Sequence, residues 1–406
     1  MNKKGVSTNT LFANPFFLNG MAWLVVMLLY PLNWSKLCQP LTEEMQWFMW
    51  INIAVSLVAG FLTNHREWIK FTPIESYSTK AIYFWLFLCW GLFLVEVAVA
   101  GGAPFFSYMR GSTALSYREF GLPIIHVIIV NGLSVLTFYL YYIKRSIPKK
   151  DKRHLKLFLL ILACFIPFVL MFNRGGILSN LIGMFVIMIL STKKLWRNLA
   201  ATFVAGLIIL FGFGIAGNMR FGPKLKNAIL AVGGATTEFK NSSIPDEFFW
   251  AYIYMCTPLA NTQNTVSRGG DMIVDSEDFQ NLIIYEFTPE LVSKRVLGVE
   301  EDVKKQHSSV LITESLNATS VYGSVYRQMG WPGMWLMFLF ILLFMLINIR
   351  IVNQDSKWFV PTLAVVDVIM IMNVFDNMFV FMGAIPQLFI LLLIYFTQKC
   401  LGKRLR

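Results

Sequence analysis

Ten runs of mostly apolar residues follow one another along the chain, separated by polar segments. Each is long enough to cross the hydrocarbon layer of a membrane, because that layer is about 30 Å thick and a helical residue rises about 1.5 Å. The short alternating strands that build a membrane barrel are missing from the pattern. The sequence therefore predicts an all-α, polytopic transmembrane bundle with spans near 14–34, 45–63, 79–100, 121–143, 155–172, 175–192, 199–217, 331–349, 358–378 and 380–398.

Composition agrees with this class, because only 14% of the 406 residues are charged against about 25% in soluble domains. The net charge of +12 could indicate nucleic-acid binding, so the positions of the charges decide its meaning. One set of alternate connections holds 21 of the 35 basic residues and four acids. Basic residues are retained on the cytoplasmic side, so we expect that side and both termini to be cytoplasmic and expect no nucleic-acid partner. The set comprises Lys3, Lys4, Arg66, Lys70, Lys80, seven residues from Lys144 to Lys156, Lys193, Lys194, Arg197, Arg350, Lys357 and four from Lys399 to Arg406.

One connection on the opposite side is very long and divides the chain into predicted parts 1–217, 218–330 and 331–406. The middle part has ten basic and thirteen acidic residues. Its apolar segments 247–260 and 279–287 are too short or too polar to span a membrane, so we expect helices at the outer membrane boundary. The loop is predicted to be an ordered cap of short helices, because a long structureless loop is uncommon.

Motifs of soluble enzymes are missing from the sequence. It has no G-x-x-x-x-G-K-[ST] loop for nucleotide phosphates and no H-E-x-x-H metal motif. Its four histidines lie far apart, its five cysteines form no C-x-x-C pair, and no Asp-x-Asp pair occurs. We therefore expect no metal and no cofactor.

Three arginines lie at the predicted outer ends of spans. Arg174 lies in the tight turn that begins at Asn173, Arg220 follows the seventh span, and Arg327 leads into the eighth. A guanidinium group matches phosphate oxygens bidentately, so this trio, with Asn173, is a candidate site for a lipid pyrophosphate. The alternative is that each arginine extends to lipid headgroups or pairs with a loop carboxylate.

The segment 313–330 supplies candidates for sugar binding and proton transfer. Asn317 can cap a helix, and three polar or aromatic side chains that follow would share one of its faces. These are Thr319, Tyr322 and Tyr326. They fit a sugar-binding surface, or equally an interfacial belt. If the reaction needs a general base, Glu314 is the first candidate and His307 the second.

Three acids fall within predicted spans: Glu96, Asp367 and Asp376, which precedes Asn377. Intramembrane acids mark functional sites by default. Structural pairing with a neighbouring helix is the alternative, and Asp376 is the stronger substrate-binding candidate because of its outer position.

The chain resembles the O-antigen polymerase (Wzy) family of oligosaccharide repeat-unit polymerases. That family is similar in its ten to twelve spans, its large external loop late in the chain, and an arginine in a tight outer turn, here Asn173-Arg174-Gly175-Gly176. Segment 254–261 (YMCTPLAN) looks like the family's Pro-containing loop helix, which makes Asn261 a candidate for substrate binding. Segments 326–333 (YRQMGWPG) and 101–104 (GGAP) are similar to further family features.

The resemblance implies a metal-independent glycosyltransferase of the bacterial inner membrane whose active site faces the periplasm. Such an enzyme moves a growing glycan from undecaprenyl pyrophosphate to the non-reducing end of a new lipid-linked unit. Membrane lipids are implied partners, and a chain-length regulator and a flippase are further candidates. Because the donor is already activated, catalysis consists of positioning and stabilisation of the departing pyrophosphate.

Two other functions remain open. An O-antigen ligase would transfer the polymer to lipid A core, and such ligases typically use a histidine in the external loop, where this chain offers His307. A flippase or transporter of lipid-linked oligosaccharides would be no enzyme, and it would be expected to show paired internal repeats, none of which is obvious here.

Overall fold

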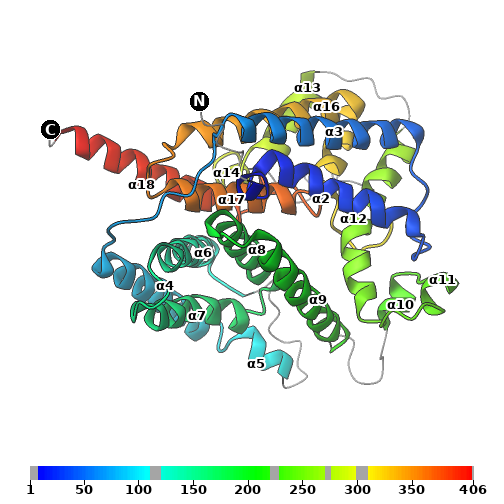
Figure 1. The fold of residues 1–406 in the computed structure, drawn as a ribbon. Helices are drawn as coiled ribbons and strands as arrows, with labels where there is room; N and C mark the ends of the chain where they lie inside the picture. Colours follow the sequence, from blue (N-terminus) through cyan, green and yellow to red (C-terminus); the bar gives the residue numbers. More distant parts are fainter. Residues whose placement is uncertain (1–7, 110–119, 220–227, 270–275, 299–309, 405–406) are drawn as a thin grey trace.

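The computed structural model describes residues 8–109, 120–219, 228–269, 276–298 and 310–404, and these ranges fold into helices (Figure 1). Within them no strand is formed, and the pairing of Ser35 with Ala235 is an isolated β-bridge. The all-α prediction is therefore confirmed for the described part of the chain.

Eight described segments are long and apolar enough to cross a membrane. They agree with the first eight predicted spans to within a few residues, except that the eighth begins much earlier. The first is α2 with the short helix η1 (Tyr30–Leu32) that follows it. In chain order the eight helices are α2 (Pro15–Leu29), α3 (Glu43–His65), α4 (Thr79–Val99), α6 (Pro123–Ser146), α7 (Arg153–Leu170), α8 (Arg174–Ser191), α9 (Leu195–Met219) and α16 (Ser320–Ile351).

The last two predicted spans differ in their bounds from the observed helices. Helix α17 covers Phe359–Met372, and the apolar part of α18 (Ile385–Arg404) covers Ile385–Leu401. The predicted extent 358–378 is wrong because Asn373 and Asn377 accept hydrogen bonds from the backbone N–H groups of Met378 and Phe379, at 3.1 and 3.0 Å. Such local bonds compete with helix formation, and they hold 373–379 in a turn.

Polar side chains join α2 to α3 inside the apolar bundle. Asn19 donates to Ser56 at 3.0 Å, and Asn14 donates to Thr63 at 2.8 Å. Close approach of the two helices depends on Gly60, where an added Cβ would lie 2.9 Å from Phe17. Small residues and interhelical hydrogen bonds are the usual means of helix association in lipid.

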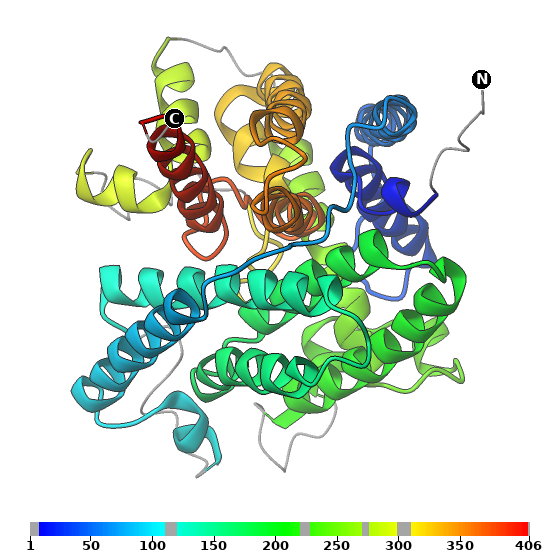
Figure 2. The same cartoon turned by 60° about the vertical axis from the view of Figure 1, so that its left-hand side comes forward.

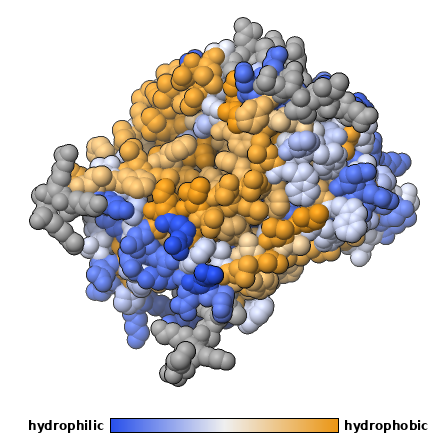
Figure 3. Space-filling view, turned by 90° about the horizontal axis from the view of Figure 1, so that it is seen from above, coloured by the Kyte–Doolittle hydropathy of each residue, from blue (hydrophilic) through white to orange (hydrophobic). Residues whose placement is uncertain are grey.

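Helix α17 lies at the centre of the molecule and packs against α2, α6, α8, α16 and α18 (Figure 1). Its residues 359–370 are all buried. Helix α9 is the opposite case, because only 6% of its most apolar window is buried. An apolar helix with so much exposed surface requires lipid or a partner around it. Figure 3 shows a broad hydrophobic zone between hydrophilic regions on the face that is uppermost in Figure 1, which supports a multi-pass membrane protein.

The helices run in two main directions. In Figure 1, α2 and α3 lie side by side across the view while α6 is seen nearly end-on. After the turn of 60° in Figure 2, α6 lies across the view and α3 is seen nearly end-on. The α2–α3 pair therefore crosses α6 at a steep angle, and α17 and α8 fill the space between them.

The described parts of the long connection fold into helices. Its longest helix, α12, packs against α16, α9 and α2, and residues 256–265 of α12 are all buried. The turn before α11 is bonded to the α2–α3 connection, with the backbone N–H of Lys36 donating to the Gly234 carbonyl at 2.8 Å. The elements are α10 (Ala228–Val232), α11 (Thr237–Lys240), α12 (Phe248–Arg268), α13 (Ser276–Leu282), the π-helical turn η2 (Ile283–Phe287) and α14 (Glu290–Arg295).

Helix α16 begins inside the predicted loop and is broken at Gly330, which has φ 56° and ψ −145°. The break coincides with the predicted boundary between loop and span. Residues 320–329 thus form a helix of their own that packs with the loop, and 331–351 form the span. The prediction that Asn317 caps this helix is wrong, because Thr319 occupies the cap position.

Candidate functional site

The start of α16 is fixed by two remote elements. Asn261 on α12 donates to the carbonyls of Leu316 and Ala318, both at 2.7 Å, and accepts from the Ile312 N–H at 2.8 Å. The N–H groups of Ser320 and Val321 donate to the carbonyls of Phe375 and Asn373, at 3.1 and 3.0 Å. These bonds, and not Asn317, decide where the helix begins, and they give Asn261 a clear structural role.

A buried carboxylate lies where the loop meets the last two helices. Glu286 of η2 is 5% exposed. Its Oε1 accepts from Gln328 Nε2 at 2.9 Å, and its Oε2 accepts from Asn377 Nδ2 at 2.9 Å. We call Glu286, Gln328 and Asn377 the carboxylate cluster. Two amide donors satisfy a carboxylate whose burial would otherwise be costly.

Two predicted site residues flank this cluster. Arg327 precedes Gln328 in the chain, Asp376 precedes Asn377, and both side chains are exposed. Because Gln328 and Asn377 bind the same carboxylate, the structure brings positions 327 and 376 to one region of the molecule. A cation and an anion on an open surface can orient polar groups of a substrate. No local pattern in the sequence indicates this contact, because Glu286 lies 42 residues from Gln328 and 91 from Asn377.

An open apolar groove of about 600 Å³ is lined in part by α14, which follows Glu286 in the chain. Three residues after Asn377, the Val380 carbonyl accepts from the Glu290 N–H at 3.0 Å, so the turn after α17 holds the first residue of α14. The groove is apolar apart from the guanidinium of Arg295. It is lined by Leu122, Pro123, Ile124, Ile125, Leu291, Val292, Arg295 and Val296.

The two basic residues at the end of α14 differ in their ion pairing. Lys294 pairs with Glu290 at 2.9 Å. No carboxylate among the described residues forms a salt bridge with Arg295, and its side chain is exposed. Within the described part of the chain, the groove therefore has an apolar wall with the guanidinium of Arg295 at its edge.

The α6 wall of the groove is held by an acid–histidine pair. Glu96, on α4, is 1% exposed and accepts from the Leu122 N–H at 2.9 Å. Its other oxygen lies 3.1 Å from His126 Nδ1. Glu96 thus caps the start of α6 from outside, where no side chain of α6 does so. Of the two sequence interpretations of Glu96, structural pairing is the one observed.

The tight turn around Arg174 is present, and it begins α8. Asn173 accepts from the Gly176 N–H at 2.8 Å and so caps the helix. The Arg174 guanidinium lies over the Phe213 ring of α9, with 4.6 Å from Cζ to the ring centroid. Such cation–π contacts are worth about 0.5–2 kcal/mol. The turn thus fixes the guanidinium between two helices.

The three predicted arginines are not seen as one cluster. Helix α8, which carries Arg174, packs against α6, α7, α9 and α17, whereas α16, which carries Arg327, packs against α12, α13, α17 and α2. Arg220 lies outside the described residues. A shared pyrophosphate site formed by all three stays a prediction.

The predicted sugar-binding face of 319–326 is packed inside the protein. Tyr322 is 1% exposed, receives a hydrogen bond from Asn52, and contacts the rings of Trp23 and Phe48. Thr319 and Tyr326 are also buried. In this structure the three side chains belong to the core, and their binding of sugars stays a prediction.

Of the candidate bases, Glu314 is exposed on the described segment before α16, and His307 lies outside the described residues. Within the described ranges, no three His, Cys, Asp or Glu side chains gather in a way that could hold a metal ion. Metal-independent chemistry stays a prediction. Comparison with protein-family models, curated proteins and solved structures finds no match to this chain.

Proposed function

We propose that this chain polymerises lipid-linked oligosaccharide repeat units at the outer face of a bacterial inner membrane. The observation that carries the proposal is the connection between the apolar groove and the carboxylate cluster. The two are joined by the bond between Glu290 and Val380, only three residues after Asn377. An apolar wall, a cation and a polar surface follow one another here, and they suit a substrate made of an isoprenoid chain, a diphosphate and sugars.

In this proposal the groove holds the isoprenoid chain of the carrier. Burial of each CH₂ group favours binding by about 0.8 kcal/mol. Arg295 at the edge binds the diphosphate through charge-assisted hydrogen bonds. Arg327 and Asp376 contact the sugars beyond it. Arg174 and Arg220 remain candidates for a second carrier lipid, because the reaction uses two.

The reaction breaks the bond between the anomeric carbon and the diphosphate oxygen of the growing glycan. A hydroxyl at the non-reducing end of the new unit forms the new glycosidic bond and loses its proton. Glu314 is the candidate acceptor of that proton, and the diphosphate leaves with its charge stabilised by guanidinium groups. No nucleotide is needed, because the donor is activated at the start.

A deletion strain tests the proposal directly. We expect core lipid bearing a single repeat unit to accumulate in place of long glycan, and purified protein to convert lipid-linked single units into oligomers in detergent. A strain that instead retains long polymer on its carrier lipid, unattached to core, would identify a ligase and overturn the proposal.

Transport of the lipid-linked unit is a second candidate function, favoured by Asp367 of α17. Its side chain is 0% exposed, and neither carboxylate oxygen has a hydrogen-bond partner among the described residues. Intramembrane acids of this kind occur in transport pathways. If transport is the function, Asp367→Asn should abolish the appearance of lipid-linked units at the outer face. Normal appearance together with normal polymerisation would assign Asp367 a packing role.

A further inference from the structure

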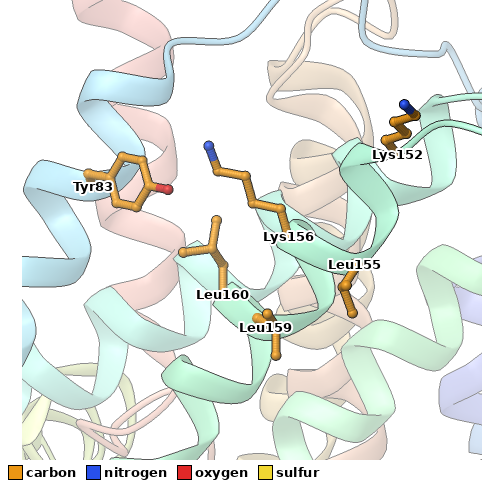
Figure 4. A pocket seen from close by; sticks show the side chains of 6 residues that line it. All are labelled: Tyr83, Lys152, Leu155, Lys156, Leu159 and Leu160. Carbon is orange, nitrogen blue, oxygen red and sulfur yellow. The ribbon is translucent and has the colours of Figure 1, made fainter.

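A second open cavity, of about 410 Å³, lies between the N-terminal parts of α4 and α7. It shares no lining residue with the groove, and it contains no residue of the carboxylate cluster. Figure 4 shows Tyr83 from α4 facing Lys156 from α7, with leucines along the same helix. The cavity is lined by Tyr83, Lys152, Leu155, Lys156, Leu159 and Leu160.

Two lysines give the cavity an uncompensated positive charge. Asp151 is the nearest acid in the chain, and it already binds Arg153, with 2.7 Å between Oδ2 and Nη2. This pairing lowers the pKa of the Asp151 carboxyl to about 2. Among the described residues, no carboxylate forms a salt bridge with Lys152 or Lys156. The cavity is therefore suited to an anion.

The rest of the wall is apolar and faces outward. Leu155 is 67% exposed and Leu159 is 55% exposed. Both lie in the first two turns of a helix that is long and apolar enough to span a membrane, and Tyr83 lies in the second turn of another. The cavity thus passes from charged to apolar residues at the end of two candidate spans, where the headgroup layer meets the acyl chains.

Tyr83 and Lys156 are held together across the cavity. The Lys156 ammonium lies 5.2 Å from the centre of the Tyr83 ring, within the range of a cation–π contact. The contact positions the ammonium group over the opening between the two helices. Tyrosine is a common residue at membrane interfaces, where its ring is in the apolar layer and its hydroxyl is near headgroups.

We propose that this cavity binds an anionic phospholipid, with its phosphate on Lys152 and Lys156 and the upper part of an acyl chain against the leucines. Basic pockets between transmembrane helices bind lipids of this class. A soluble anion would use the lysines and leave the leucines exposed to water. Alternatively, the two lysines belong only to the general excess of positive charge expected on one side of the membrane. The test below distinguishes a specific lipid site from this general charge.

The test uses the full-length protein in nanodiscs of phosphatidylcholine with increasing fractions of phosphatidylglycerol, and it measures the lipids retained by native mass spectrometry. The cavity variant is Lys152→Gln/Lys156→Gln. The matched control is Lys149→Gln/Lys150→Gln, which removes the same charge from the same connection but not from the cavity wall. We expect the cavity variant to bind phosphatidylglycerol about thirtyfold more weakly, because it loses the attraction of two lysines, and the control to change less than about threefold.

Two results would overturn the proposal. Equal weakening in both variants would mean that the lysines act only through their summed charge. Equal competition by soluble glycerol 1-phosphate would mean an anion site without a lipid-chain subsite. Leu155→Ser gives an independent check. Because the side chain of Leu155 is exposed, its replacement should weaken retention of the lipid and leave the melting temperature of the protein unchanged.

Discussion

Asn377 donates from one side-chain nitrogen to two oxygens of Glu286, to the carboxylate at 2.9 Å and to the backbone carbonyl at 3.0 Å. The two residues are 91 positions apart in the chain. The bond joins the long connection to the turn between α17 and α18. The groove wall formed by α14 begins at Leu291, five residues after Glu286. The carboxylate cluster is therefore expected to stabilise both the fold and the site.

Glu286→Gln should reduce the free energy of unfolding. A carboxylate can accept from both amides, whereas the new glutamine has one acceptor oxygen and leaves a buried donor without a partner, at a cost of about 1–3 kcal/mol. Reversible unfolding in detergent measures the change. Glu290→Gln is the control, because Glu290 pairs with Lys294 near the surface and such pairs contribute less than about 1 kcal/mol. Equal losses in the two variants would contradict the proposed role of the cluster.

Gly330→Ala should destabilise the protein and disturb the junction between loop and span. The backbone angles at Gly330 are strained for other residues by about 1–3 kcal/mol. Gly206→Ala in α9 is the matched control, because a Cβ there meets no atom within 4 Å and alanine favours a helix by up to about 1 kcal/mol. The melting temperatures of the two variants should move in opposite directions. A Gly330→Ala protein as stable as the wild type would show that the kink is not required.

Asn173→Ala should loosen the start of α8 and, through it, the position of Arg174. Loss of a side-chain cap costs about 0.5–2 kcal/mol. Asn173→Ser supplies another acceptor and should recover most of the loss in melting temperature and in polymerising activity. If Asn173→Ala reduces activity while stability is unchanged, Asn173 contacts the substrate directly, as the sequence also allows.

Arg295→Gln should raise the KM for a lipid-linked substrate by about tenfold to one hundredfold, because a charge-assisted hydrogen bond contributes about 1.5–3 kcal/mol. We expect kcat to fall as well, because the diphosphate that Arg295 binds is also the leaving group of the reaction. Lys294→Gln is the matched control, because Lys294 already pairs with Glu290 and should affect KM less than about twofold. Indistinguishable KM values in the two variants would remove Arg295 from the carrier site.

The apolar helices could be located from sequence because hydropathy is a local property. The run predicted at 155–172 is α7 at Arg153–Leu170, and the run at 175–192 is α8 at Arg174–Ser191. The predicted ends of the helices were wrong where hydrogen bonds of polar groups start or stop a helix. Helix α16 extends eleven residues before the predicted 331 because its first turn bonds to the backbone of 373–375, and α17 ends early because Asn373 and Asn377 bond to their own turn.

The candidate site depended on information that no segment carries alone. Arginine in a tight turn was visible in the sequence, but the position of its guanidinium over Phe213 was not, because that contact requires the packing of α8 on α9. Tyr322 was a candidate for sugar binding because its spacing places it on one helix face with Thr319 and Tyr326, yet its hydroxyl accepts a hydrogen bond from Asn52 of α3 in the core.

The sequence by itself determined that the chain folds into apolar helices. In lipid, a run of about twenty apolar residues forms a helix because only its own backbone can supply the hydrogen bonds that its N–H and C=O groups need. Only the tertiary structure decided which polar groups meet. Glu286, Gln328 and Asn377 come from three separate segments, and a carboxylate in an apolar interior is tolerated only where packing brings donors to it.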